Sequence, residues 1–229
     1  MYQDWADVIF LHWKVDAQLL LPHIPQGITL DLFEGDAYVT LVAFTVRNAH
    51  PRYIPPIAGI ADFDEVNLRT YVTDGVRPGI TFLDIKANNL VQVMLNRLVG
   101  LPYKRAAIHR ENTASAVSYY SMTGKHQKVI SLVYKVEERI EEKAALDKWL
   151  SERYCNYQQV GGRLYRYNIH HYEWPLMTVS VEGDINYTYE QLSFSLLNMT
   201  AAHYSKGVNV LFWWRQLQVV KRERGRRMC

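Results

Sequence analysis

The sequence predicts a β-dominated α+β fold, and three observations support this prediction. Segments of β-branched and aromatic residues outnumber segments with helical spacing, and the two kinds rarely alternate along the chain. This order favours an antiparallel or mixed sheet over a nucleotide-binding α/β fold. The chain has 229 residues without an internal repeat, low-complexity segment or linker, a length that suits one large β domain.

The strands are predicted from β-branched and aromatic composition bounded by turn residues. Residues 37–46 (AYVTLVAFTV) follow a turn at 34–36, and residues 65–72 (EVNLRTYV) alternate between two faces. A later pair of strands around a turn at 123–125 is typical of a hairpin. In chain order, the predicted strands are 37–46, 65–72, 80–87, 114–122, 128–137, 163–171, 176–182 and 208–214.

Helices are fewer. Residues 90–98 carry apolar side chains at helical spacing after two asparagines, and Gly100 with Pro102 stops the pattern. A second helix is predicted over 143–154, and short helices are predicted near 16–21 and 189–199. The Pro-rich stretch 50–64 is predicted to be a long irregular loop, because strands flank it on both sides.

The charge is distributed unevenly. The chain has 26 Lys and Arg against 23 Asp and Glu, but residues 221–229 hold five basic residues and a single acid. Residues 1–220 are therefore close to neutral, and they give no indication of a nucleic-acid partner. We expect one domain over residues 1–220, followed by a flexible basic tail over 221–229.

Cysteine usage and hydropathy indicate the compartment. The scarcity of cysteine (Cys155 and Cys229) fits a reducing environment, and no basic region precedes an apolar stretch near Met1. No apolar run approaches the length of about 18 residues that a membrane helix needs. The expectation is a cytoplasmic protein without membrane contact. A homo-oligomer is compatible with the sequence.

Common catalytic signatures are absent. The chain has no Gly-rich dinucleotide or P-loop motif, no G-x-S-x-G and no H-E-x-x-H. His170 and His171 are adjacent in a predicted strand and point to opposite faces, and the other histidines lack ligand spacing. No cofactor or metal is therefore expected, although distant segments can still assemble a metal site.

The strand 65–72 carries the first candidate binding residues. On one of its faces lie Glu65, Asn67, Arg69 and Tyr71. Either this face is the solvated side of a half-buried sheet, or it lines a closed cavity in which the Arg69 guanidinium can hold a carboxylate through two hydrogen bonds. Asp84 and Lys86 share a face of the next strand, where they could extend the same polar lining.

The segment 97–105 carries the second group of candidates. A helix ends at Gly100, and the next strand begins near the adjacent cations Lys104 and Arg105. If Lys104 were buried beside Arg105, desolvation and repulsion would favour its neutral amine, which can attack a carbonyl to form a Schiff base. The alternative is a pair of solvated basic residues at the start of a strand.

Several segments together carry a family resemblance. To about residue 220 the chain resembles the uncharacterised YqjF-type family, a domain of unknown function grouped with the acetoacetate decarboxylase-like superfamily. The resemblance implies a cone-shaped, mostly antiparallel β-barrel with a central cavity and a few peripheral helices. It rests on residues 10–13 (FLHW), 21–28 (LPHIPQGI), 66–72 (VNLRTYV), 100–103 (GLPY), 149–154 (WLSERY), 174–176 (WPL) and 204–208 (YSKGV).

The resemblance also implies a site. The decarboxylases carry a G-F-P-K-K segment, whose first lysine forms the Schiff base and whose second lowers the pKa of the first. The corresponding residues here are 100–104 (GLPYK), so Tyr103 stands at the nucleophile position and Lys104 at the helper position. A phenol cannot form an imine, and acetoacetate decarboxylation by that route is not expected. Glu65 is a loose match to a cavity glutamate of the decarboxylases.

These candidates predict an internal pocket for a small anionic or carbonyl-containing molecule. As an enzyme, the protein would be a lyase, isomerase or hydrolase acting on oxo acids, with Tyr103 as general acid or base if Lys104 depressed its pKa. The alternatives are a non-catalytic binding or sensing protein and an interaction module that uses exposed aromatics. The candidate catalytic residues are Tyr103, Lys104 and Glu65, and the candidate ligand-binding residues are Arg69, Tyr71, Lys86 and Arg105.

Overall fold

The strands predicted from composition are present in a computed structural model that describes residues 1–112, 117–123 and 128–218. β3 (Ala37–His50), β4 (Phe63–Thr73) and β5 (Pro78–Ala87) confirm the first three, and residues 51–62 between β3 and β4 form the predicted irregular loop. The predicted hairpin is confirmed by the antiparallel pair β8 (Val117–Thr123) and β9 (Lys128–Arg139). Residues 114–116, most of the turn at 123–125 and the tail 221–229 lie outside the described residues.

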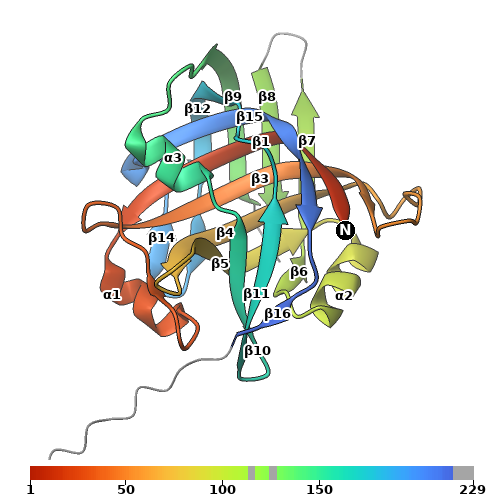
Figure 1. The fold of residues 1–229 in the computed structure, drawn as a ribbon. Helices are drawn as coiled ribbons and strands as arrows, with labels where there is room; N and C mark the ends of the chain where they lie inside the picture. Colours follow the sequence, from red (N-terminus) through yellow and green to blue (C-terminus); the bar gives the residue numbers. More distant parts are fainter. Residues whose placement is uncertain (113–116, 124–127, 219–229) are drawn as a thin grey trace, which may run out of the picture.

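Seven strands close into a ring (Figure 1). β5, β4 and β3 continue into β1 (Tyr2–Val15) and β15 (Ala201–Phe212), and β11 (Arg163–His170) pairs with both β15 and β10 (Cys155–Val160). β10 completes the ring through a parallel bridge to β5, whereas the other pairings in the ring are antiparallel. The ring has an interior face, and this face holds the candidate site.

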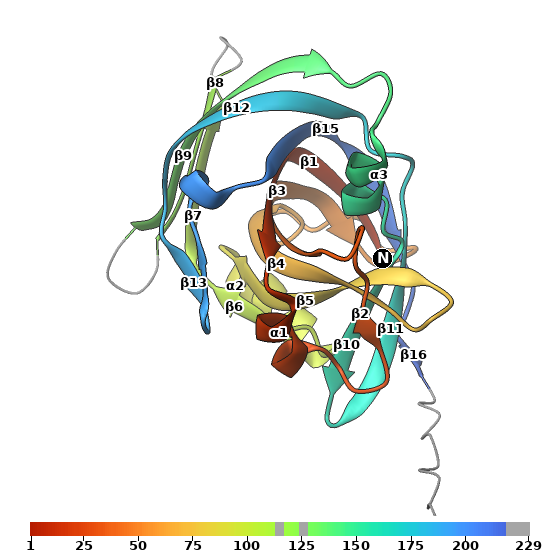
Figure 2. The ribbon, with the colours of Figure 1, turned by 90° about the vertical axis from the view of Figure 1, so that its left-hand side faces the viewer.

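The sheet continues beyond the ring. From β15 it extends through β12 (Leu176–Ile185), β9, β8 and β7 (Ala107–Asn112), which Figure 2 shows as a curved wall beside the ring. The largest apolar cluster lies between this wall and the outer face of the ring, and it includes Leu11, Leu41, Leu68 and Leu132. β1, β3 and β4 are therefore buried on both faces, which explains the nearly continuous apolar run of β3.

The remaining elements are short. α3 (Ala145–Ser151) packs Leu150 and Trp149 against Tyr38 and Tyr71, as expected from its apolar stripe. β6 (Tyr103–Arg105) adds a parallel strand beside β5. The others are α1 (Ala17–Leu20), α2 (Leu90–Leu98), β2 (Thr29–Leu30), the hairpin β13 (Tyr187–Tyr189) and β14 (Leu192–Phe194), β16 (Gln216–Leu217), and the 3₁₀ turns Leu21–His23 and Leu196–Asn198.

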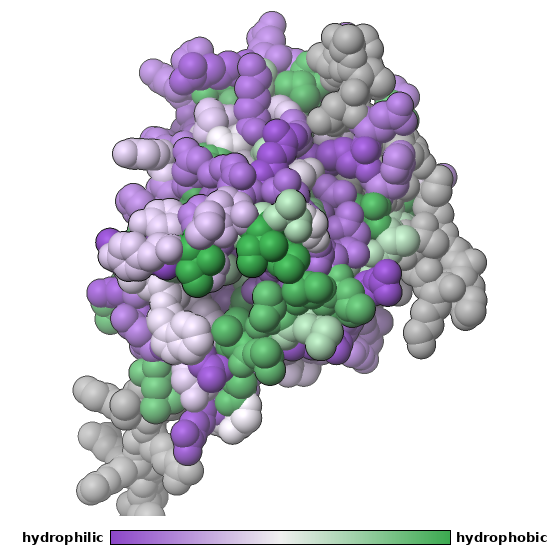
Figure 3. Space-filling view, turned by 90° about the vertical axis from the view of Figure 1, so that its right-hand side faces the viewer, coloured by the Kyte–Doolittle hydropathy of each residue, from purple (hydrophilic) through white to green (hydrophobic). Residues whose placement is uncertain are grey.

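Several elements differ from the sequence predictions, among them the strands β7 and β10, which were not predicted. The helix predicted near 189–199 is wrong, because β14 and a 3₁₀ turn occupy those residues. β1 was not predicted, since early acids interrupt its pattern, yet ten of its residues pair with β15. α2 confirms a predicted helix but presents its apolar stripe to solvent, and Figure 3 shows hydrophobic residues gathered on that face.

A close approach between β1 and β15 predicts a large stability effect. Gly207 has a φ of +130°, and a Cβ there would collide with the carbonyl oxygen of Trp5. Gly207→Ala is expected to lower the free energy of unfolding by about 3 kcal/mol, because strain and a backbone clash add. Gly35→Ala has a similar φ of +89° without any atom within 4 Å, so it should cost only about 1 kcal/mol. Equal losses in urea denaturation would contradict this account.

Candidate ligand pocket

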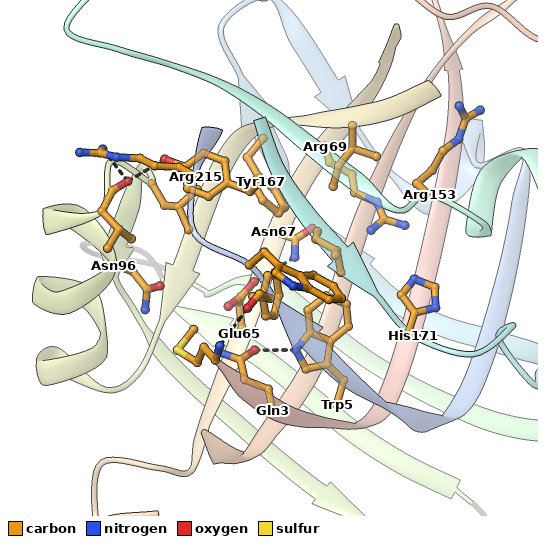
Figure 4. Close-up of a pocket in the computed structure, with 18 of the residues that line it drawn as sticks. Gln3, Trp5, Glu65, Asn67, Arg69, Asn96, Arg153, Tyr167, His171 and Arg215 are labelled. Atoms are coloured by element: carbon orange, nitrogen blue, oxygen red, sulfur yellow. Dashed lines mark hydrogen bonds between the residues drawn. The ribbon is translucent and has the colours of Figure 1, made fainter. Parts of the chain in front are cut away.

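The interior of the ring contains a cavity of about 160 Å³, termed the central pocket. A cavity of about 150 Å³ holds one benzene molecule, so this volume suits a small molecule. Aromatic and aliphatic side chains line the pocket together with polar and charged ones (Figure 4). The polar lining comprises Gln3, Glu65, Asn67, Arg69, Asn96, Tyr103, Ser151, Arg153, His171 and Arg215, and the walls include Trp5, Phe82, Ile169, Trp174 and Phe212.

β4 supplies the central row of polar side chains. Glu65, Asn67 and Arg69 all line the pocket, and with Tyr71 they are only 0–6% exposed. The interpretation of this face as a solvated surface is therefore wrong. Tyr71 does not line the pocket, because its hydroxyl donates to the carbonyl oxygen of Leu150 at 2.9 Å and contacts the hydroxyl of Thr40 at 2.5 Å.

Glu65 and Tyr103 form a hydrogen-bonded pair at one end of this row. The Tyr103 hydroxyl donates to Glu65 Oε2 at 2.6 Å, and the Asn67 amide donates to Oε1 at 3.0 Å. Burial raises the pKa of Glu65 to about 7 in spite of both hydrogen bonds. Burial, followed by the charge of Glu65, raises the pKa of Tyr103 well above its ordinary value. The pair thus combines a carboxyl that titrates near neutrality with a neutral phenol.

Arg69 is a buried cation without a counter-charge. Its Nε and Nη2 atoms have no hydrogen-bond partner, and no carboxylate of the described residues forms an ion pair with it. Its guanidinium lies over the ring of Phe10, with Cζ 5.7 Å from the ring centroid. A buried, uncompensated charge is costly, so an anion that entered the pocket beside Arg69 would stabilise it.

Two histidines and a carboxylate form a chain of polar side chains behind Arg69. His12 contacts Thr40 Oγ1 through Nδ1 at 2.8 Å and His203 Nδ1 through Nε2 at 3.1 Å. His203 in turn lies 3.2 Å from the carboxylate of Asp147. Burial, followed by the neighbouring His203 and Arg69, lowers the pKa of His12 well below its ordinary value. His12 therefore adds no charge beside Arg69, and the Asp147 carboxylate at the end of the chain contacts His203 rather than Arg69.

Arg153, the second buried arginine of the pocket, shows the contrasting arrangement. It forms an ion pair with Asp31, and its Nε donates to the carbonyl oxygen of Trp149 at 2.7 Å. Its guanidinium also stacks over the Trp149 ring at 4.4 Å. The charge of Arg153 is compensated within the protein, so of these two buried arginines Arg69 is the one without a counter-charge.

The predicted extension of the polar lining by Asp84 and Lys86 is wrong. The β4–β5 register places Asp84 opposite Leu68 and Lys86 opposite Val66, so both side chains project from the face away from the pocket. There Lys86 contacts Asp84 and Tyr187. Which face of β5 lines the pocket is set by its register with β4, and the sequence of β5 alone does not show this register.

Tyr103 and Lys104 are neighbours in β6, and their side chains point to opposite faces of the strand. Tyr103 turns inward, while Lys104 lies 2.9 Å from Asp84 Oδ1 with its side chain 57% exposed. Arg105 is exposed and is not among the pocket-lining residues. The burial that would activate Lys104 is absent. The expectation that Lys104 depresses the pKa of Tyr103 is wrong, because Glu65 is the neighbour of that phenol.

Several pocket residues had no local signal in the sequence. Gln3 and Trp5 enter from β1, where Trp5 Nε1 donates to Gln3 Oε1 at 2.8 Å. Arg153 and Trp174 lie in two of the segments that carry the family resemblance. That resemblance was the one feature of the sequence that could have indicated these two pocket residues. Within the described ranges, no group of three His, Cys, Asp or Glu side chains is placed to hold a metal, and no helix is long and apolar enough to cross a membrane.

A closed, mostly antiparallel sheet around a small pocket defines the acetoacetate decarboxylase-like fold, and comparison with solved structures agrees. The chain is similar to the enduracididine biosynthesis enzyme MppR complexed with pyruvate, with a TM-score of 0.69 and 11% identity over 96% of this chain and 90% of that one. It is also similar to an acetoacetate decarboxylase-like enzyme from Sphingomonas wittichii RW1, with a TM-score of 0.66 and 17% identity over 95% and 93% of the two chains. A third similar structure is acetoacetate decarboxylase from Legionella pneumophila, with a TM-score of 0.62 and 12% identity over 95% and 87%.

The sequence comparisons establish the family. The chain belongs to DUF2071, a family of uncharacterized conserved proteins whose model matches residues 2–209. It is 34% identical over 218 residues to the uncharacterized protein YqjF of Bacillus subtilis (strain 168), covering 93% of this chain and 90% of the relative. The resemblance predicted from the sequence is thereby confirmed.

Proposed function

We propose that the protein is an enzyme that transfers a proton on a small oxo acid bound in the central pocket. The observation that carries the proposal is the row on β4, where an uncompensated buried Arg69 shares a face with Glu65, a carboxyl of pKa about 7. Arg69 binds the carboxylate of the substrate through its free donors. Glu65 acts as the general base, because its pKa lies near the working pH.

The proposed step is proton abstraction next to a carbonyl. Glu65 as carboxylate takes a proton from the carbon beside the substrate carbonyl, and the electron pair of that C–H bond moves to the carbonyl oxygen as an enolate. Once Glu65 is protonated, the Tyr103 hydroxyl no longer faces an anion and can donate to the enolate oxygen. Return of a proton from Glu65 to the same carbon restores the oxo acid, and exchange of that proton with solvent beforehand completes a hydrogen exchange.

The named ligands of similar structures support the substrate class. MppR binds pyruvate in one structure and the condensation product of pyruvate and imidazole 4-carboxaldehyde in another. Both ligands contain a carboxylate. A carboxylate is the kind of group that an arginine without a counter-charge, such as Arg69, can bind. The alternative function is a non-catalytic oxo-acid binding protein, which is favoured by the absence of lysine from the described pocket lining.

Hydrogen–deuterium exchange tests the proposal. Small 2- and 3-oxo acids are incubated with the protein in D₂O, and the protons beside the carbonyl are followed by NMR. We expect the protein to accelerate exchange of at least one acid, and Glu65→Gln to slow it by about 100-fold or more.

Lys104→Ala is the matched control. It should keep the exchange, and borohydride should trap no adduct on the parent protein, because Lys104 lies outside the pocket. An adduct that Lys104→Ala abolishes would instead establish imine chemistry. Saturable binding without exchange would support the binding protein.

A further inference from the structure

α2 is an amphipathic helix that packs with its polar side inward. Five of its six large apolar residues are 42–78% exposed, whereas the sixth, Val93, is buried together with Gln92 and Asn96. Gln92 donates to the carbonyl oxygen of Ile60 at 2.8 Å, and Asn96 donates to that of Gln92 at 2.9 Å. An apolar helix stripe normally faces a core. Here polar contacts hold the helix in place, and the stripe lies on the surface.

The neighbouring loop extends this apolar area. The Asn89 side chain donates to the carbonyl oxygen of Gly59 at 2.9 Å, which fixes the loop 51–62 beside the start of α2. Ile54 and Ile57 of this loop are 49% and 57% exposed. Figure 3 shows hydrophobic residues gathered on this side of the molecule. The α2 surface, defined as residues 51–62 and 90–98, is therefore an exposed apolar patch of a kind that marks interaction sites.

We propose that the α2 surface binds the same surface of a second copy of this chain in a two-fold dimer. Arg97 is an exposed cation of the α2 surface, and its Nε donates to the carbonyl oxygen of Tyr103 at 2.7 Å. Exposed charges of both signs, Arg52 and Asp62, lie in the loop. A two-fold axis can bring such charges together around an apolar centre, whereas an anionic membrane selects a patch flanked by cations.

The pattern of side chains also fits a self-complementary contact. Leu90, Met94 and Leu98 form one ridge at a spacing of four residues, and Val91 and Leu95 form the adjacent ridge. Two such surfaces interdigitate at a crossing angle of about −50°. The sixteen exposed residues of the α2 surface come close to the lower end of a standard interface, which uses about 20 residues per side. Met94 is the central residue of α2, so a symmetric crossing places it near its own copy.

Sedimentation velocity over a range of concentrations tests the dimer. We expect a dimer for the full chain and a monomer for Met94→Glu, since a charge at the two-fold axis would meet its own copy. Val76→Glu is the matched control, because Val76 is 83% exposed but lies outside the α2 surface, and it should stay dimeric. Met94→Leu should also stay dimeric, and circular dichroism reports whether Met94→Glu is folded.

A disulfide across the axis tests the geometry independently. Met94→Cys, made with Cys229→Ser, should oxidise to a covalent dimer, while the buried Cys155 does not react. The proposal is overturned if the full chain is a monomer at every concentration, or if Met94→Glu stays dimeric and Met94→Cys does not cross-link. Binding of a monomer to lipid vesicles that Met94→Glu abolishes would assign the surface to a membrane instead.

Discussion

Arg69→Met is expected to abolish oxo-acid binding while making the protein more stable. Arg69 holds an uncompensated charge in the ring interior, and a methionine of comparable length removes the charge without leaving a large cavity. We expect the free energy of unfolding to rise by about 1–3 kcal/mol in the absence of ligand. The affinity for an oxo acid should fall by about 100-fold or more, because the charge-assisted hydrogen bonds are lost. Urea denaturation and isothermal titration calorimetry measure the two effects.

Arg153→Met provides the opposite case. Arg153 is equally buried, but it is paired with Asp31 and stacked over Trp149, so its removal leaves a carboxylate without its partner. The free energy of unfolding should then fall by about 3 kcal/mol. If Arg69→Met destabilised the protein as much as Arg153→Met does, Arg69 would be a structural residue and its proposed role in binding would fail.

Glu65→Gln is expected to change how stability depends on pH. The pKa of Glu65 is about 7 in the folded protein against 4.5 for the free side chain, so the folded state holds a proton that the unfolded state has released. The contribution of Glu65 to stability is therefore fully present below about pH 4.5 and is lost as the pH rises through about 7. Glu65→Gln should match the parent protein at pH 4.5 and exceed it by about 3 kcal/mol at pH 8.

Urea denaturation at several pH values measures this difference, and Glu152→Gln is its control. Although burial alone raises the pKa of Glu152, hydrogen bonds from Lys143 and Tyr154 lower it overall. Its contribution is present at neutral pH and is lost as the pH falls, so Glu152→Gln should be less stable than the parent at pH 7. A parallel response of both glutamine variants would show that Glu65 is an ordinary paired carboxylate.

Arg69→Met and Glu65→Gln are both expected to stabilise the folded protein and to impair its proposed function. A buried arginine with free donors and a buried carboxyl of pKa about 7 each destabilise the folded chain, whereas the same volume of apolar side chain would not. Such groups are expected where a ligand or a reaction uses them. Their position on one face of β4 is what links them to a single pocket.

The sequence determined those features that depend on local periodicity. Alternation along 65–72 placed Glu65, Asn67 and Arg69 on one face, and helical spacing identified α2. These periods follow from the backbone geometry of a strand and a helix, which each segment carries by itself. The segments that carry the family resemblance also predicted the family and the fold.

The tertiary structure decided what depends on partners distant in sequence. The register between β4 and β5 turned Lys86 away from the pocket, and contacts with the loop at Ile60 turned the polar side of α2 inward. β1 became a central strand because it pairs with β15, about 200 residues away. Whether Arg69 has a counter-charge depends on every side chain around it. The periodicity of a sequence shows which residues share a face of a strand or helix. Contacts with residues distant in sequence determine which of these faces is buried.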